Sequence, residues 1–231
     1  MFCERFLKYN VSKKVEAFST MVGAELPYCV VQPHQVHGDK LAIILDKKTT
    51  RDELEGIDAL ITPIKNCPIA VRTADCVPIL LYDAIKEVVA AIHSGWKGTV
   101  SKIARKVVNE LQKSFDVEPS NLLAVIGPSI SIDAFQVGEE VVESLHKEGF
   151  PMNIMHKYYG PKNELNVLSG HHIDLWKANQ WLLEESGVKT ENIIVSGVCT
   201  YYNKDFHSAR REKNNKCPRI INVIKMFCNY G

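Results

Sequence analysis

The sequence lacks several features that would assign it quickly to a class of protein. Its 231 residues carry 28 basic and 27 acidic side chains, so the formal charge is only +1. No strong net charge therefore draws the chain to nucleic acid or to an anionic membrane. No apolar run approaches the ~20 residues needed to cross a bilayer. We expect neither nucleic acid nor a membrane as a partner, and a small neutral or mildly charged substrate instead.

The sequence also lacks regular cysteine spacing and any segment that would mark a domain boundary. The seven cysteines are odd in number, and the first residues lack the basic stretch and apolar core of a secretion signal. These absences predict a reduced, cytoplasmic protein. The length fits one large domain or two small ones. Because we find no linker, low-complexity tract or repeat, we expect a single domain over residues 1–231. Nothing in the sequence fixes an oligomeric state.

What the sequence does contain is a series of short β-branched runs, with fewer helical patterns. We expect strands at 28–31, 41–45, 59–62, 69–73, 77–82, 88–93, 122–126, 193–196 and 220–224. An apolar stripe at helical spacing predicts a helix over 100–115. Shorter helices are expected at 139–147 and 174–186, the second capped by Asp174 and ended by Gly187. This mixture predicts a mixed α/β or α+β sandwich.

Two residues at strand ends indicate chemistry. Cys76 lies between two apolar runs, and His93 ends the run 88–92. A thiolate and an imidazole are groups that bind zinc or form a Cys-His nucleophilic pair. A buried structural cysteine is the plain alternative, since free cysteine is among the most buried residue types. Asp75 favours a functional site, because an apolar strand does not carry a charge without a purpose.

A third ligand is expected upstream, within residues 32–38. His34 and His37 would point to opposite faces of a strand, so at most one of them enters a shared site. We favour His37, which precedes Gly38. No compact zinc motif has a gap as long as that between His37 and Cys76, so the set depends on convergence in space. Three protein ligands would leave the fourth zinc position open to water, as in catalytic sites.

Blocks along the chain resemble, in order, those of a bacterial family. They lie at 35–38, 58–62, 73–78, 91–98, 126–130, 135–138, 199–200 and 206–211. The Ala-Asp-Cys and His-Ser-Gly-Trp-Lys-Gly blocks are the most specific. The family was long labelled multicopper polyphenol oxidase or laccase. It was later reassigned as a purine nucleoside phosphorylase with adenosine deaminase and methylthioadenosine phosphorylase activity. The resemblance covers roughly residues 15–224.

The resemblance implies a fold and a metal centre. The fold is an α+β, α/β/β/α sandwich with a central β core. The metal is zinc, with copper as the alternative, held by His37, Cys76 and His93. The implied substrates are phosphate and a purine nucleoside: adenosine, inosine, guanosine or methylthioadenosine. We expect Asp75, Cys76 and His93 to be catalytic. Zinc lowers the pKa of bound water to about 7, which suits deamination, with Asp75 carrying protons.

Phosphorolysis also needs residues that bind phosphate. The two-pronged donor geometry of arginine suits that anion. We expect Gln35, Lys97, Arg210 and Arg211 to bind substrate, and Arg72 is a further candidate. Arg210 and Arg211 are adjacent, so on an extended segment only one of them would face inward.

The sequence departs from the family pattern at several places. Met21 stands where members usually carry an arginine, and the Asn- and Gly-rich segment expected before His37 is missing. The usual Tyr-Glu reads Phe135-Gln136, and the usual Gly-Arg reads Cys217-Pro218-Arg219. The loss of a basic residue at position 21 leaves the substrate preference open.

Three other functions compete with this one. Phenol oxidation by several coppers needs a histidine-rich cluster, whereas the chain has eight histidines and no His-x-His pair. A metal-free hydrolase, for example one that edits cell-wall precursors, would use Cys76 as nucleophile and His93 as base. A binding module with structural zinc would need a fourth ligand, for which His34 and Cys199 are the candidates. The chain is long enough to fold on its core alone, which favours catalysis.

Overall fold

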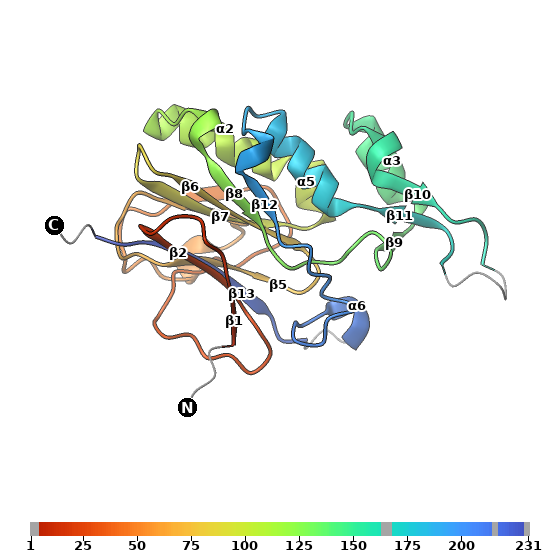
Figure 1. The fold of residues 1–231 in the computed structure, drawn as a ribbon, viewed down its shortest axis with the longest axis horizontal. Coiled ribbons are helices and arrows are strands. Elements are labelled where there is room, and N and C mark those ends of the chain that lie inside the picture. Colours follow the sequence, from red (N-terminus) through yellow and green to blue (C-terminus); the bar gives the residue numbers. More distant parts are fainter. Residues whose placement is uncertain (1–4, 163–167, 214–216, 229–231) are drawn as a thin grey trace.

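The computed structural model describes residues 5–162, 168–213 and 217–228, and it has an α+β fold. Figure 1 shows a layer of helices over one sheet and a second sheet beneath that sheet. The α+β class expected from the sequence is confirmed. Within the described residues, no helix has the length and apolarity that crossing a membrane requires.

The sheet beneath the helices has six strands. Their order is β12-β8-β6-β7-β4-β3. The bounds are β3 Leu41–Ile43, β4 Ala59–Thr62, β6 Val77–Asp83, β7 Val88–Ser94, β8 Leu123–Ile126 and β12 Ile193–Val195. The central strands β4, β6 and β7 are buried along their whole length, because the sheet is covered on both faces.

The second sheet has four antiparallel strands in the order β1-β2-β13-β5. Its strands are β1 Phe6–Lys8, β2 Val15–Thr20, β5 Ile69–Thr73 and β13 Ile220–Met226. Alternate residues such as Ala17 and Val71 pack against the six-stranded sheet. Their neighbours, such as Phe18 and Ala70, face outward. There Leu26, Tyr28 and Val30 cover them.

The helices cover the other face of the six-stranded sheet. They include α1 Trp96–Val100, α2 Ile103–Phe115 and α5 Leu175–Glu184. The remaining α-helices are α3 Glu139–Lys147, α4 Met152–Met155 and α6 Ala209–Glu212. Short 3₁₀ helices occur at Asp52–Leu54, Pro119–Asn121 and Thr190–Asn192. A small sheet in the order β10-β11-β9 joins β9 Gln136–Val137, β10 His156–Tyr158 and β11 His171–Ile173.

Two predicted elements differ from the structure. The helix expected from residue 100 is interrupted, because Lys102 has a left-handed φ of 59° between α1 and α2. The strand expected at 28–31 is wrong: only an isolated bridge joins Val31 to Ile69. That segment covers the outer face of the four-stranded sheet, so its apolar residues reflect burial without strand pairing.

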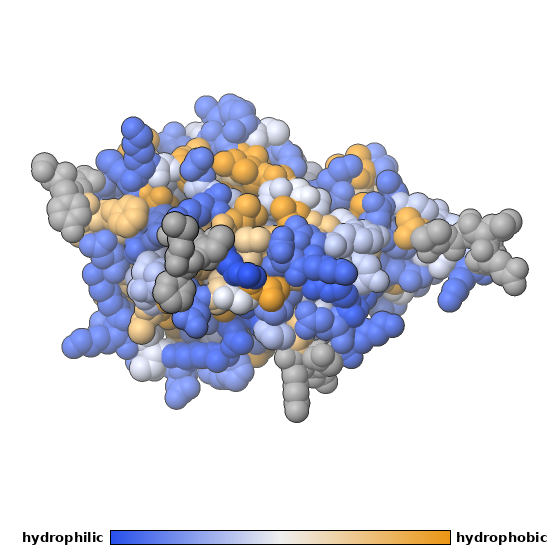
Figure 2. All heavy atoms as spheres, turned by 60° about the horizontal axis from the view of Figure 1, so that its bottom comes forward, coloured by the Kyte–Doolittle hydropathy of each residue, from blue (hydrophilic) through white to orange (hydrophobic). Residues whose placement is uncertain are grey.

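The two hydrophobic cores lie between layers. One core joins the helices to the six-stranded sheet through residues such as Val107 and Leu182. The other fills the gap between the two sheets with residues such as Leu80 and Ile224. The face seen in Figure 2 is largely hydrophilic, with apolar residues in small groups between charged ones.

Candidate metal centre and its cavity

Strand pairing brings the site residues to one edge of the gap between the sheets. In β4 and β7, Ala59 pairs with Ile92, so the residue before β4, Asp58, lies beside His93. In β6 and β7, Pro78 pairs with His93, which places Cys76 close by. Alternation along β7 puts His93 on the same face as Val89 and Ala91, toward the gap between the sheets.

The structure brings His37, Cys76 and His93 together. One ligand atom from each lies within 4.8 Å of the other two. The rings of His37 and His93 meet edge to face, with their centroids 4.8 Å apart. His93 is 2% exposed, Cys76 is half-buried and His37 is exposed. The cluster is therefore closed on the His93 side and open on the His37 side.

No fourth protein ligand joins this cluster among the residues that the structure describes. His34 forms an ion pair with Glu55 instead. The Cys199 sulfur accepts hydrogen bonds from the Ser131 amide at 3.3 Å and from the Ser131 hydroxyl at 3.0 Å. The fourth ligand that a closed structural zinc site would need is therefore supplied by neither residue.

The Asp58 carboxylate holds two of the ligands in place. Its Oδ1 accepts hydrogen bonds from Nδ1 of His93 at 2.7 Å and from the His37 amide at 3.0 Å. Its Oδ2 accepts from the amides of Gly38 and Val36 at 2.8 and 3.3 Å. His37 has a left-handed φ of 62°, and these bonds to the backbone hold that conformation. With Nδ1 of His93 donating to Asp58, its Nε2 is the ring nitrogen that a metal would bind in place of a proton.

No role was predicted for Asp58, although a signal was present in the sequence. The residue is a charge directly before Ala59–Thr62, a strand that is buried throughout. It is itself fully buried. A buried carboxylate requires partners, and here they are the groups that shape the cluster.

The charges of Cys76 and His93 depend on each other. Burial raises the pKa of Cys76, but the charge of His93 and hydrogen bonds from His37 and His93 outweigh burial and lower it to about 6. Burial lowers the pKa of His93, but the Cys76 thiolate and the Asp58 hydrogen bond raise it above its ordinary value. Without a metal, these two side chains form a thiolate–imidazolium pair.

The donor set fits a transition metal such as zinc. One sulfur and two imidazole nitrogens are ligands that zinc prefers, and the carboxylate behind His93 is the usual partner of a metal-bound imidazole. Gly95 leaves room beside the cluster: a Cβ there would lie 3.0 Å from the Cys76 sulfur and 3.4 Å from Cδ2 of His37. A side chain at position 95 would therefore displace two of the three ligands.

The cluster opens into a cavity of about 860 Å³. The residues of the predicted site that line it are Gln35, His37, Asp75, Cys76, His93 and Arg210. Lys97 and Arg211 are not among the described residues that line it. Lys97 lies over the Trp96 ring, 5.7 Å from the ring centroid. Nη1 and Nη2 of Arg211 donate to four backbone carbonyls, those of Thr200, Tyr201, Asn203 and Phe206.

Asp75 and Arg210 are connected at the cavity wall. One Asp75 carboxylate oxygen accepts from the Thr200 hydroxyl at 2.6 Å, and the other accepts from the Arg210 amide at 2.7 Å. The Arg210 guanidinium lies over the Phe135 ring, 5.5 Å from the centroid. Asp75 therefore fixes the backbone that carries Arg210. The proton transfer predicted for Asp75 would compete with these two bonds.

Three further arginines form a basic region of the wall. Arg51, Arg72 and Arg219 all line the cavity. Burial and the charges of Arg51 and Arg219 lower the pKa of Arg72. No carboxylate within the described part of the chain forms an ion pair with Arg51, Arg72 or Arg219. Unpaired guanidiniums facing one another are suited to bind an anion.

Gln35 supports this basic region through the backbone. Its Oε1 accepts from the Arg72 amide at 2.8 Å, and its Nε2 donates to the Arg72 carbonyl at 2.9 Å. Both ends of the Gln35 amide are therefore engaged in positioning Arg72.

Comparison with known proteins agrees with this geometry. A family model described as multi-copper polyphenol oxidoreductase laccase matches residues 8–227. The chain belongs to this family. A purine nucleoside phosphorylase of Bacteroides thetaiotaomicron is 38% identical to it over 87% of this chain and 74% of the relative. A protein named adenosine deaminase RL5, from an unknown prokaryotic organism, is 40% identical over 79% of this chain and 70% of the relative.

Solved structures show the same fold for this laccase-family chain. YfiH of Bacillus licheniformis superposes with a TM-score of 0.85 and covers 97% of both chains at 23% identity. YlmD of Geobacillus stearothermophilus gives a TM-score of 0.80, covering 99% and 98% at 23% identity. Although the family is named for multicopper enzymes, the described residues contain two groups of three side chains that could hold a metal, and neither group has more than two histidines.

Proposed function

We propose that the chain is a purine nucleoside phosphorylase that uses zinc held by His37, Cys76 and His93. One observation carries the proposal: the three-ligand cluster opens into the same cavity as Arg51, Arg72 and Arg219, which have no ion-pair partner within the described residues. A metal centre and an anion site in one cavity suit a reaction between a purine nucleoside and phosphate. The names of relatives that are 32–38% identical support this assignment.

Phosphorolysis would divide the cavity into two parts. The arginines would bind phosphate so that one of its oxygens attacks the anomeric carbon of the ribose. The bond from that carbon to the purine nitrogen then breaks, and the departing base takes up a proton. Ile130 and Phe135 line the cavity as well and would pack against the purine, since aromatic and aliphatic walls suit flat ligands. Arg210, whose backbone is fixed by Asp75, would contact the substrate where the phosphate part and the purine part of the cavity meet.

Zinc held by His37, Cys76 and His93 would supply Lewis acidity at this end of the cavity. The chain's own contribution is positional: Asp58 keeps the Nδ1 proton on His93 and shapes the His37 loop. Half-burial of the cysteine and full burial of His93 exclude water from the back of the site, which strengthens every electrostatic interaction there.

Adenosine deamination is a second activity of the same site in this proposal. The relative named adenosine deaminase RL5 is 40% identical to this chain, and three protein ligands leave a metal position open for water. We propose adenosine, inosine, guanosine and methylthioadenosine as substrates for phosphorolysis, with deamination acting on adenosine.

A metal-free Cys-His hydrolase is the competing function. The lowered pKa of Cys76 and the raised pKa of His93 are what such a nucleophilic pair would show. Copper-dependent phenol oxidation fits less well, because neither described ligand group offers the many histidines of a multicopper cluster.

Product analysis tests the assignment. Metal-analysed protein is incubated with adenosine, with and without phosphate. We expect adenine and ribose 1-phosphate only when phosphate is present, and inosine in both incubations. His93→Ala should abolish both activities, while the matched control His146→Ala, on the exposed face of α3, should leave them unchanged. The proposal fails if no product forms with metal-loaded protein, or if His93→Ala behaves as the wild type does.

The anion site has its own test. Arg72→Gln should raise KM for phosphate at least tenfold and leave phosphate-independent deamination within about twofold of wild type. Arg105→Gln, on α2 and outside the cavity, is the matched control. Equal loss of both activities in Arg72→Gln would contradict a phosphate-binding role.

A further inference from the structure

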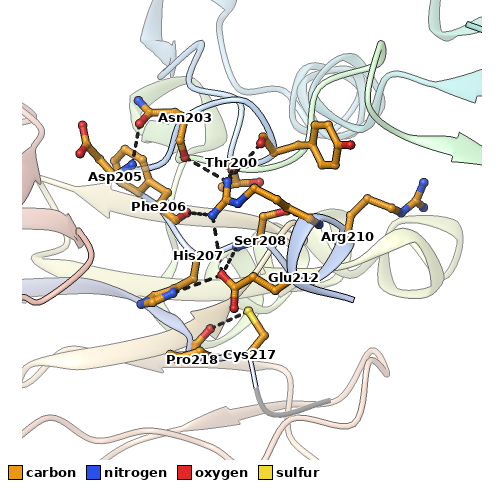
Figure 3. A network of polar contacts seen from close by, with 12 residues as sticks. Thr200, Asn203, Asp205, Phe206, His207, Ser208, Arg210, Glu212, Cys217 and Pro218 are labelled. Carbon is orange, nitrogen blue, oxygen red and sulfur yellow. Dashed lines mark hydrogen bonds and ion pairs between the residues drawn. The ribbon is translucent and has the colours of Figure 1, made fainter. Parts of the chain in front are cut away.

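A second group of metal-ligating side chains lies near the cavity wall. His207, Glu212 and Cys217 each place one ligand atom within 4.8 Å of the other two. Figure 3 shows the His207 ring, the Glu212 carboxylate and the Cys217 sulfur side by side. They share no residue with the first cluster.

We propose that His207, Glu212 and Cys217 form a second site for a divalent transition metal such as Zn²⁺. The three side chains offer imidazole nitrogen, carboxylate oxygen and sulfur, all of which are zinc ligands. The thiol is free to serve, because Cys217 forms no disulfide.

The distances require little movement. With bonds of about 2.0–2.3 Å to a tetrahedral zinc, ligand atoms lie roughly 3.5 Å apart. Nδ1 of His207 is already 3.6 Å from Oε1 of Glu212. The Cys217 thiol donates to the Pro218 carbonyl at 3.2 Å, and its sulfur lies within 4.8 Å of the ligand atoms of His207 and Glu212. Metal binding would release the thiol proton and replace this bond to Pro218.

The surroundings hold the ligands in place. Cys217 is 5% exposed, and the side chains of His207 and Glu212 are 19% and 25% exposed. Oε1 of Glu212 accepts from the Ser208 amide at 3.4 Å. Nη2 of Arg211 lies 3.6 Å from the same oxygen. Its positive charge opposes a cation, but this guanidinium is already committed to backbone carbonyls. Once a metal has displaced the thiol proton, the thiolate and the carboxylate would give the site two negative charges against that one.

The position of the site connects it to the cavity. His207 lies just before α6, Glu212 is the last residue of α6, and Cys217 lies just before β13, so a bound metal would tie the two elements together. The same segments carry Arg210 and Arg219, which line the cavity. Arg219 also donates a hydrogen bond to the Cys217 carbonyl. Cys217 lines the cavity as well, so a second metal would fix part of the basic wall.

Metal stoichiometry tests this inference directly. Full-length protein is stripped with a chelator and dialysed against zinc, with a weak competing chelator present to remove ions held by single thiols. Zinc per chain is then measured. We expect two ions in the wild type, one in Cys217→Ser, one in Cys76→Ser and none in the double variant. Cys29→Ser, an exposed cysteine outside both groups, is the matched control and should retain two.

Cobalt provides a spectroscopic readout at the second site alone. Cobalt-loaded Cys76→Ser should retain a sulfur-to-cobalt charge-transfer band, which the further change Cys217→Ser should remove. Wild-type stoichiometry in Cys217→Ser, or no such band in Cys76→Ser, would overturn the proposal. If Cys217→Ser fails to fold by circular dichroism, His207→Gln takes its place with the same expected loss of one zinc. Neither measurement depends on catalytic activity.

Discussion

At the level of single residues, the Asp58 carboxylate connects the two histidines of the candidate metal centre. It accepts from the ring of His93 and from three successive amides at 36–38. Burial raises the pKa of Asp58, but these hydrogen bonds outweigh burial and lower it overall. Asp58 is therefore an anion at neutral pH, and it acts on the ligands without contacting the metal itself.

Asp58→Asn should weaken metal binding by about 10–100-fold, the usual effect of losing a carboxylate behind a metal-bound histidine. An amide has one acceptor oxygen, so it cannot serve the ring and all three backbone donors. Competition with a chromophoric chelator measures the affinity. Asp116→Asn changes an exposed carboxylate that pairs with Lys86 and should have no effect. Unchanged affinity in Asp58→Asn would contradict the positioning role.

The thiol of Cys76 should be unusually reactive in protein stripped of metal. Because its pKa is lowered to about 6 from an ordinary 9.0, the thiolate forms as pH rises through about 6, and alkylation should reach half its maximal rate there. Peptide mass spectrometry follows the label at Cys76. Added zinc should protect the residue. A half-maximal rate near pH 9, or no protection by zinc, would argue against the proposed environment.

At the level of elements, every strand of the six-stranded sheet was predicted as a short β-branched run, whereas β1 and β2 of the four-stranded sheet were missed. Strands β4, β5, β6 and β7 read as continuous apolar runs. Strand β2 was missed because Glu16, Ser19 and Thr20 interrupt its apolar pattern. In the folded protein these residues have partners that only pairing reveals, such as Lys225 for Glu16.

Only part of the candidate site was predictable from the sequence. His37, Cys76 and His93 are identified by their chemistry, because each stands at the end of an apolar run or beside a glycine. Asp58 and Gly95 acquire a role only when β4, β6 and β7 are paired. The basic wall formed by Arg51, Arg72 and Arg219 could not be predicted for the same reason, since Arg51 and Arg219 are far apart in sequence. Lys97 does not line the cavity among the described residues; it belongs to α1, which begins at Trp96, and its amine lies over the Trp96 ring.

Asn222→Ala in β13 should destabilise the fold. Asn222 is fully buried, accepts from the Ser19 hydroxyl at 2.5 Å and donates to the Thr73 hydroxyl at 3.0 Å. Its loss removes hydrogen bonds from buried groups on β2 and β5, although Ser19 keeps its bond to the Tyr9 hydroxyl at 2.7 Å; the change costs about 1–3 kcal/mol. Denaturant unfolding measures the change. Asn109→Ala, exposed on α2, should stay within about 0.5 kcal/mol, and an equal effect of both variants would contradict this account.

At the level of the whole molecule, folding and metal binding should be separable. The two hydrophobic cores that join the layers include none of the three metal ligands. Chelation should therefore leave the circular dichroism spectrum unchanged at 25 °C while turnover falls below detection. Zinc should restore turnover. A structural zinc site supplies folding free energy outright, so unfolding on chelation would support the binding-module alternative instead.

Because Arg51, Arg72 and Arg219 lie at one wall of the cavity, the stability of the protein should depend on the anion in the buffer. Three like charges that face one another repel when nothing lies between them, and any oxyanion that enters relieves this strain. At a hundredfold excess over its dissociation constant, such an anion would stabilise the protein by about 2.7 kcal/mol. The melting temperature should rise in phosphate or sulfate relative to chloride at equal ionic strength. Arg72→Gln should reduce that difference; an equal difference in both proteins would show that the anions act elsewhere.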